Sequence, residues 1–177
     1  IERFVVITYK VPTYNIINEK LHCYPEVGLI GCSGPVDSVG FFTKPEIHNL
    51  SKIQSLYLDE ESQTSVQLAK IILEKLYQIN MESIALLNKE QAHSADAQLL
   101  IGDKALSFKN KIQNSGYRYW DLGELWKEMT GFGFVFAAWA SQKPLNSSQI
   151  DTLNTAKNKG LAQLNEIQTA HQLTAAQ

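Results

Sequence analysis

A short apolar strand, a polar loop and an amphipathic helix follow one another between residues 56 and 77, and this order constrains the fold more than any other feature. Leu56–Leu58 has the composition of a strand, and further strands are predicted over Ser83–Leu87 and Gln98–Ile101. Apolar residues recur at helical spacing after the loop: Val66, Ala69, Ile72, Leu73 and Leu76. A strand, a helix and two more strands in this order indicate an α/β fold with a parallel sheet.

The start of this helix is the first candidate ligand site. Hydroxyl groups gather in the segment Ser62-Gln63-Thr64-Ser65, immediately before the apolar stripe. The first turn of a helix has unpaired N–H groups and the positive end of the helix dipole, so it favours a carboxylate or a phosphate. We therefore take Thr64 and Ser65 as candidate binding residues. The alternative is that Ser62 or Thr64 only caps the helix.

Two further candidate sites lie at turns beside strands. Gly102 and Asp103 follow a predicted strand directly, and ligands of parallel sheets gather beyond the carboxyl ends of strands. Glycine permits close backbone approach, and Asp103 can accept a hydrogen bond from a substrate hydroxyl; its alternative role is to cap the turn at Lys104. Ser33 and Gly34 can bind a ligand through backbone N–H groups, whereas the pattern Gly-Pro that follows equally indicates a plain turn.

The second half of the chain carries recognisable helix ends. Asp121 and Glu124 have capping-box spacing, and a helix over 122–129 is predicted to end at Thr130-Gly131. Residues 132–140 are almost all apolar, which predicts a strand buried on both faces. Cap spacing recurs at residues 146–149, before a long final helix whose apolar face would comprise Ile150, Leu153, Leu161, Leu164 and Ile167.

Composition and charge narrow the possible partners. The 177 residues are 44% hydrophobic and carry a net charge of −2, so the chain supplies no strong field for nucleic acid or an anionic membrane. No apolar run is long enough to span a bilayer. The four histidines show no zinc-ligand spacing, so we expect no metal site.

Cysteine usage and the first residues bear on the compartment. Cys23 and Cys32 form no CxxC pair, which favours free thiols in a reducing compartment; a single disulfide between them is the alternative. No charged segment followed by an apolar one precedes the first predicted strand, residues 4–9, so no signal peptide is visible. We therefore expect a cytoplasmic protein.

The order of the motifs is more specific than any one of them. The segments are Ser33-Gly34-Pro35-Val36 with Ser38-Val39, Ser62-Gln63-Thr64-Ser65-Val66, Ile101-Gly102-Asp103-Lys104-Ala105-Leu106, Asp121-Leu122-Gly123-Glu124-Leu125-Trp126, Thr130-Gly131 and Phe134-Val135-Phe136-Ala137-Ala138-Trp139-Ala140. In this order they resemble the chorismate dehydratase family of the futalosine route to menaquinone, over most of residues 24–170. The sister family that makes dihydroxynaphthoate in the same pathway fits less well.

The resemblance implies a type II periplasmic-binding-protein-like fold, with two α/β lobes and a ligand cleft. Lobe 1 would comprise residues 1–43 and 132–177, lobe 2 residues 44–131, and Val36–Phe42 and the region after residue 132 would cross between them. The family opens with a Tyr-x-Asn-x-x-Pro type motif that has no counterpart here, and this chain reads Tyr14-Asn15 where the family has a Glu-Tyr pair. We therefore expect an incomplete first lobe, with its N-terminal section either outside this chain or lost.

The resemblance also implies a reaction: dehydration of chorismate to 3-[(1-carboxyvinyl)oxy]benzoate, without a cofactor. The substrate is a small dicarboxylate, and the positions that would bind it are Thr64, Ser65, Gly102, Asp103, Ser33 and Gly34. No catalytic base is identified, because no His–Asp pair or pair of carboxylates stands out. The alternatives are a non-catalytic solute-binding protein of the same fold for a small carboxylate, and an α/β structural or interaction module.

Overall fold

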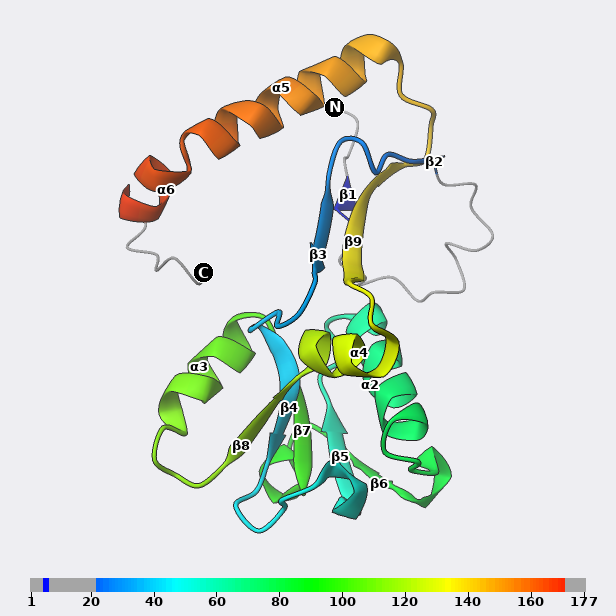
Figure 1. The fold of residues 1–177 in the computed structure, drawn as a ribbon, viewed down its shortest axis with the longest axis vertical. Helices are drawn as coiled ribbons and strands as arrows, with labels where there is room; N and C mark the ends of the chain where they lie inside the picture. The colour runs from blue at the N-terminus through cyan, green and yellow to red at the C-terminus, as the bar shows by residue number, and fades with distance from the viewer. Residues whose placement is uncertain (1–4, 7–21, 171–177) are drawn as a thin grey trace. The chain divides into compact units, whose positions relative to one another are not determined.

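The computed structural model describes residues 5–6 and 22–170, which fall into two compact units (Figure 1). Of these residues, 5–6, 22–30 and 137–170 form the first unit and 31–136 form the second. Both units combine strands with helices, so the fold is mixed α/β, as the strand and helix order predicts. None of the helices in the described ranges has the length and apolar character that crossing a bilayer requires.

The second unit is built on a five-stranded sheet in the order β6-β5-β7-β4-β8. β5 pairs in parallel with β6 and β7, whereas β4 pairs antiparallel with β7 and β8. The strands are β4 (Val39–Thr43), β5 (Ser55–Leu58), β6 (Ala85–Leu87), β7 (Ala97–Ile101) and β8 (Arg118–Asp121). Because β4 runs against its neighbours, it begins at the edge where β5, β7 and β8 end.

Helices cover both faces of this sheet. They are α2 (Gln63–Lys75), α3 (Asp103–Lys111) and α4 (Leu122–Thr130), and short 3-10 turns lie at Leu50–Lys52, Met81–Ser83 and Ala92–Ser94. Neighbouring strand residues point to opposite faces. Phe41 and Leu99 therefore join the larger core with residues of α2 and α4, whereas Phe42 and Leu100 join a smaller cluster with Ala105 of α3.

The first unit contains the other sheet and the last two helices. β9 (Phe134–Ser141) pairs with β1 (Val5–Val6), β2 (His22–Cys23) and β3 (Leu29–Cys32). α5 (Ser147–Ala162) and α6 (Leu164–Ala170) follow. Asn146 and Gln149 close a capping box at the start of α5, as their spacing predicts. Of the strand predicted over residues 4–9, only Val5–Val6 lies among the described residues.

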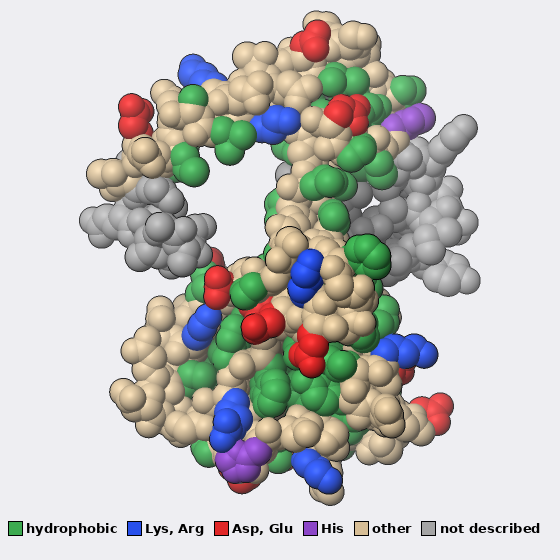
Figure 2. All heavy atoms as spheres, viewed as in Figure 1, with side chains coloured by type: hydrophobic (Ala, Val, Ile, Leu, Met, Phe, Trp, Pro, Cys, Tyr) green, Lys and Arg blue, Asp and Glu red, His purple; other side chains and the backbone are tan. Residues whose placement is uncertain are grey.

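Two predictions for the C-terminal part are wrong. Residues 134–141 do form a strand, but only Ala137 and Ala140 are buried, because α5 buries none of its side chains and so does not seal the sheet. The final helix is also interrupted at Gln163, three residues after the helix-weakening Gly160. Its predicted apolar face is exposed at Leu161, Leu164 and Ile167, and Figure 2 shows apolar side chains on the surface of α5 and α6.

The boundary between the units also differs from the predicted lobes. Residues 31–43 were expected in lobe 1, with Val36–Phe42 crossing between lobes, but the structure places β4 in the second unit. The reason is that β4 has pairing partners on both sides and all five of its residues are buried. The strands that continue from one unit into the other are β3 and β9.

Candidate functional site

Four loops of the second unit end at one edge of its sheet. Residue pairs Val39–Ile101 and Gly40–Asp121 fix the start of β4 beside the ends of β7 and β8. The end of β5 lies beside β7, where the Asp59 N–H donates to the Leu99 carbonyl over 3.1 Å. The helices α2, α3 and α4 all begin within a few residues of this edge. Three positive helix ends therefore face the same side of the unit.

The start of α2 is capped by its own serines. Ser62 is the N-cap, and its Oγ accepts hydrogen bonds from the Ser65 N–H at 3.3 Å and the Ser65 hydroxyl at 3.1 Å. Ser65 is buried, so its hydroxyl is engaged in the cap, whereas Thr64 is only half-buried. The structure therefore shows the capping interpretation for Ser62 and leaves Thr64 as the accessible hydroxyl at this helix end.

The start of α3 has no side-chain cap. Gly102 occupies the N-cap position with φ of 62°, a left-handed conformation that favours glycine, and its N–H donates to the Ser38 carbonyl at 2.7 Å. No described side chain accepts a hydrogen bond from the first turn of α3, so its N–H groups have no side-chain partner among the described residues. Asp103 lies in this first turn and is exposed. It is not the N-cap, since Gly102 takes that position.

An ion-pair cluster connects the starts of α2 and α3. The Lys104 ammonium contacts Asp59 at 2.9 Å and Glu61 at 2.8 Å, and only 3% of the Asp59 side chain is exposed. Hydrogen bonds to Glu61 and Asp59 raise the pKa of Lys104 above its usual range. The pairing of Lys104 with Asp59 was not predicted from the sequence. It could have been inferred from the position of both residues, because each closely follows one of two neighbouring parallel strands.

A pH-dependent contribution to stability follows from this cluster. A lysine whose pKa is raised on folding stabilises the protein at pH values below its unfolded-state pKa of about 10.4. This stability is lost as the pH rises through the folded-state pKa. Lys104 is 44% exposed, so solvent screens the effect, and we expect about 1 kcal/mol or less. Lys104→Met should be less stable than the parent at about pH 9, with a smaller difference at about pH 11.

The measurement is urea unfolding of both proteins at the two pH values. Lys75→Met, at an exposed lysine of α2, is the matched control and should show no such change. A difference that stays constant with pH would show that Lys104 stabilises by packing and not by charge.

The loop with Ser33 and Gly34 is held to the start of α4 by Asp121. The Asp121 carboxylate is buried and accepts from the Val36 N–H at 2.9 Å and the Asp37 N–H at 2.7 Å. It also accepts from two N–H groups in the first turn of α4, at 2.8 and 3.1 Å. Ser33 itself is exposed and Gly34 has φ of 142°. This loop therefore has a defined position at the same edge.

Tyr119 completes the anchor of this loop. Its hydroxyl lies 3.0 Å from Asp121 Oδ2 and donates to the Asp37 carbonyl at 2.9 Å. Burial and then the nearby Asp121 charge raise the pKa of Tyr119, so it stays protonated and remains a donor. Lys109 pairs with the Asp37 carboxylate at 3.0 Å and lies over the Tyr119 ring, 4.4 Å from its centroid. Only the capping role of Asp121 was visible in the sequence.

All six candidate residues thus belong to loops or helix starts at one edge. Thr64 and Ser65 lie on α2, Gly102 and Asp103 at the start of α3, and Ser33 with Gly34 before β4. Within the described ranges, histidine, cysteine and acidic side chains form no group of three or more that could hold a metal ion. The arrangement offers backbone N–H groups and the hydroxyls of the half-buried Thr64 and the exposed Ser33, which suit an anionic ligand.

Comparison with known proteins gives the family. The sequence model of a menaquinone biosynthesis family matches residues 11–175. A chorismate dehydratase from Thermus thermophilus is 29% identical, in a match that covers 77% of this chain and 55% of that protein, so the chain spans little more than half of that relative.

Solved structures give weaker matches. The match to a protein from Archaeoglobus fulgidus has a TM-score of 0.47 and 12% sequence identity. It covers 78% of this chain and 49% of the Archaeoglobus chain. An ancestral arginine-binding protein bound to glutamine has a TM-score of 0.41 at 15% identity, covering 78% and 60%. The family match extends over nearly the whole sequence and confirms the resemblance found in the motifs. The chain therefore belongs to the menaquinone biosynthesis family.

Proposed function

We propose that this protein dehydrates chorismate to 3-[(1-carboxyvinyl)oxy]benzoate. Membership of the menaquinone biosynthesis family supports a role in that pathway, and the relative from Thermus thermophilus carries the name of this activity. The proposal includes the compartment and fold expected from the sequence: a cytoplasmic enzyme with a type II periplasmic-binding-protein-like fold and an incomplete first lobe. Among the described residues the first unit is made of separate chain segments and the second unit runs from 31 to 136, which supports such a fold.

The reaction needs positioning more than a strong base. A proton leaves the ring carbon that carries the enolpyruvyl ether, the neighbouring hydroxyl leaves as water, and the ring becomes aromatic. Aromatisation supplies the driving force, so the protein must hold two carboxylates in a productive pose and assist the departing groups. A protein with a net charge of −2 has to attract a dianion through local donors.

One observation carries the proposal: three helices begin at one sheet edge, and α3 begins without a side-chain cap. The open N–H groups of α3 suit one substrate carboxylate. Thr64 can donate to the same or the second carboxylate from the start of α2. Asp103, in the first turn of α3, would face the ring or its hydroxyl, and the backbone of Ser33 and Gly34 would add further donors.

Incubation with chorismate tests the reaction. We expect the mass of one water to be lost and the ultraviolet spectrum of a substituted benzoate to develop, with heat-denatured protein as the control. If this chain yields no dehydrated product while a complete relative does so under the same conditions, the dehydratase proposal fails for this chain.

A substitution at α2 tests the binding role of Thr64. Thr64→Val removes a hydroxyl with little change in shape, and we expect affinity for 3-substituted benzoates to fall about tenfold, the worth of one hydrogen bond to a charged group. Isothermal titration calorimetry measures this directly. Thr155→Val, at an exposed threonine of α5, is the control. Equal affinity in the parent and both variants would restrict Thr64 to a structural role.

The second candidate function is non-catalytic binding of a small carboxylate. It is favoured by the engagement of three carboxylates at this edge: Asp59 pairs with Lys104, Asp37 with Lys109, and Asp121 binds the loop and the start of α4. Asp103 is an exposed acid in the first turn of α3. Binding of 3-substituted benzoates without turnover of chorismate would favour this function over the enzyme.

A further inference from the structure

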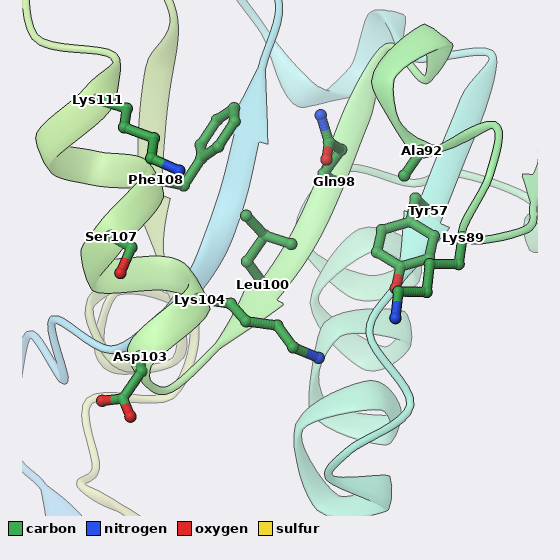
Figure 3. A pocket seen from close by; sticks show the side chains of 10 residues that line it. All are labelled: Tyr57, Lys89, Ala92, Gln98, Leu100, Asp103, Lys104, Ser107, Phe108 and Lys111. Atoms are coloured by element: carbon green, nitrogen blue, oxygen red, sulfur yellow. The ribbon is translucent and has the colours of Figure 1, made fainter.

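A pocket in the second unit lies on a face of the sheet and has a volume of about 460 Å³. Its floor is formed by Tyr57 of β5 and by Gln98 and Leu100 of β7. In Figure 3, α3 with Phe108 forms one wall, and the segment around Ala92 forms the opposite wall. This size suits a small organic molecule.

A buried polar group opens into this pocket. Gln98 is 8% exposed, and its side chain lines the floor. No residue within 5–6 or 22–170 forms a hydrogen bond with its side-chain amide, and none of the described buried side-chain nitrogen or oxygen atoms lacks a partner, so the amide atoms reach the solvent in the pocket. The amide is therefore available to donate to a ligand there.

The charge around the pocket is positive. Lys89, Lys104 and Lys111 line it, against the single acid Asp103. Lys104 is committed to Asp59 and Glu61, as described above. Lys89 and Lys111 are exposed and form no ion pair with any described residue. Figure 3 shows them on opposite sides of the pocket, Lys111 from α3 and Lys89 from the facing segment.

We propose that this pocket binds a small aromatic carboxylate. Its ring would lie between Tyr57, Phe108 and Leu100, its carboxylate or carboxylates would pair with Lys89 and Lys111, and the Gln98 amide would donate to one oxygen. Aromatic side chains at the floor and wall provide the flat apolar contact, and lysines provide point charges for a carboxylate. The site meets the helix starts at the sheet edge only at Asp103 and Lys104, because its other lining residues come from the sheet face, the segment around Ala92 and the outer turns of α3.

The test uses benzene-1,3-dicarboxylate as the probe and amide NMR as the readout. We expect saturable shifts at residues 87–92 and 105–111, whether or not shifts also appear at residues 62–66 and 102–103. Lys89→Gln with Lys111→Gln should weaken the shifts at the pocket at least tenfold. Lys52→Gln with Lys75→Gln removes the same charge from exposed positions of the same unit and should leave them unchanged.

A third variant separates the amide from its structural surroundings. Gln98→Leu should weaken binding at the pocket several-fold without lowering the melting temperature, since it removes a side-chain amide that forms no hydrogen bond with a described residue. Three results would each overturn the proposal: no saturable shifts at the pocket, equal weakening by both lysine pairs, or equal binding of the uncharged dimethyl ester. The proposed dehydratase activity depends on none of these outcomes, because Lys89, Lys111 and Gln98 lie outside its site.

Discussion

Replacing Asp121 with alanine is expected to lower the free energy of unfolding by about 3 kcal/mol, among the larger effects of a single substitution. The carboxylate is buried and accepts hydrogen bonds from the N–H groups of Val36, Asp37, Gly123 and Glu124. Alanine leaves these four donors without their acceptor and removes the cap of α4. Urea unfolding measures the loss, and hydrogen exchange at Val36 and Asp37 should quicken first.

Two further variants define what Asp121 contributes. Asp121→Asn keeps one acceptor oxygen and should cost about half as much as alanine. Glu90→Ala, at an exposed acid of the same unit, is the control and should stay within about 0.5 kcal/mol of the parent. A loss below about 1 kcal/mol for Asp121→Ala would mean that water replaces the carboxylate at these donors.

The helix ends could be predicted from the sequence because their chemistry is local. Asp121 caps α4, Gly131 ends it with φ of 76°, and Asn146 with Gln149 forms the predicted capping box. Each of these features depends on residues within about four positions of one another, so the spacing alone shows them. The strand and helix order over residues 55–101 was predictable for the same reason.

The long-range contacts could not be predicted in this way. The bond from the Val36 N–H to Asp121 spans 85 residues, and Lys104 reaches Asp59 over 45 residues. Both depend on the strand order: the first on β4 lying beside β8, and the second on β5 lying beside β7. The sequence interpretation assigned this segment to the other lobe. The candidate site was thus predicted as separate loops, and the contacts that join them came only from the structure.

Replacing Asp103 with asparagine is expected to reduce turnover of chorismate about a hundredfold, the lower range for loss of a general acid or base. This prediction rests on the proposed function and adds to it a proton-transfer role for Asp103, which would face the ring or its hydroxyl. Asp103 is exposed at the uncapped start of α3, while Asp59 and Asp37 are each paired with a lysine. Asparagine keeps the shape and can still bind the substrate hydroxyl, but it cannot take or return a proton. The loss should therefore fall on kcat and leave KM nearly unchanged.

Steady-state kinetics with purified protein separates the two roles of this side chain. Glu74→Gln removes the same charge from an exposed position of α2 and should leave both constants unchanged. Asp103→Asn with normal kcat and a raised KM would assign Asp103 to binding, and the proton would then have to leave through water or the substrate itself. That result would not remove the dehydratase activity, because aromatisation drives the elimination and the helix starts still position the dianion. It would instead show that this edge acts mainly by holding its ligand, the property that an enzyme and a binding protein of one fold would share.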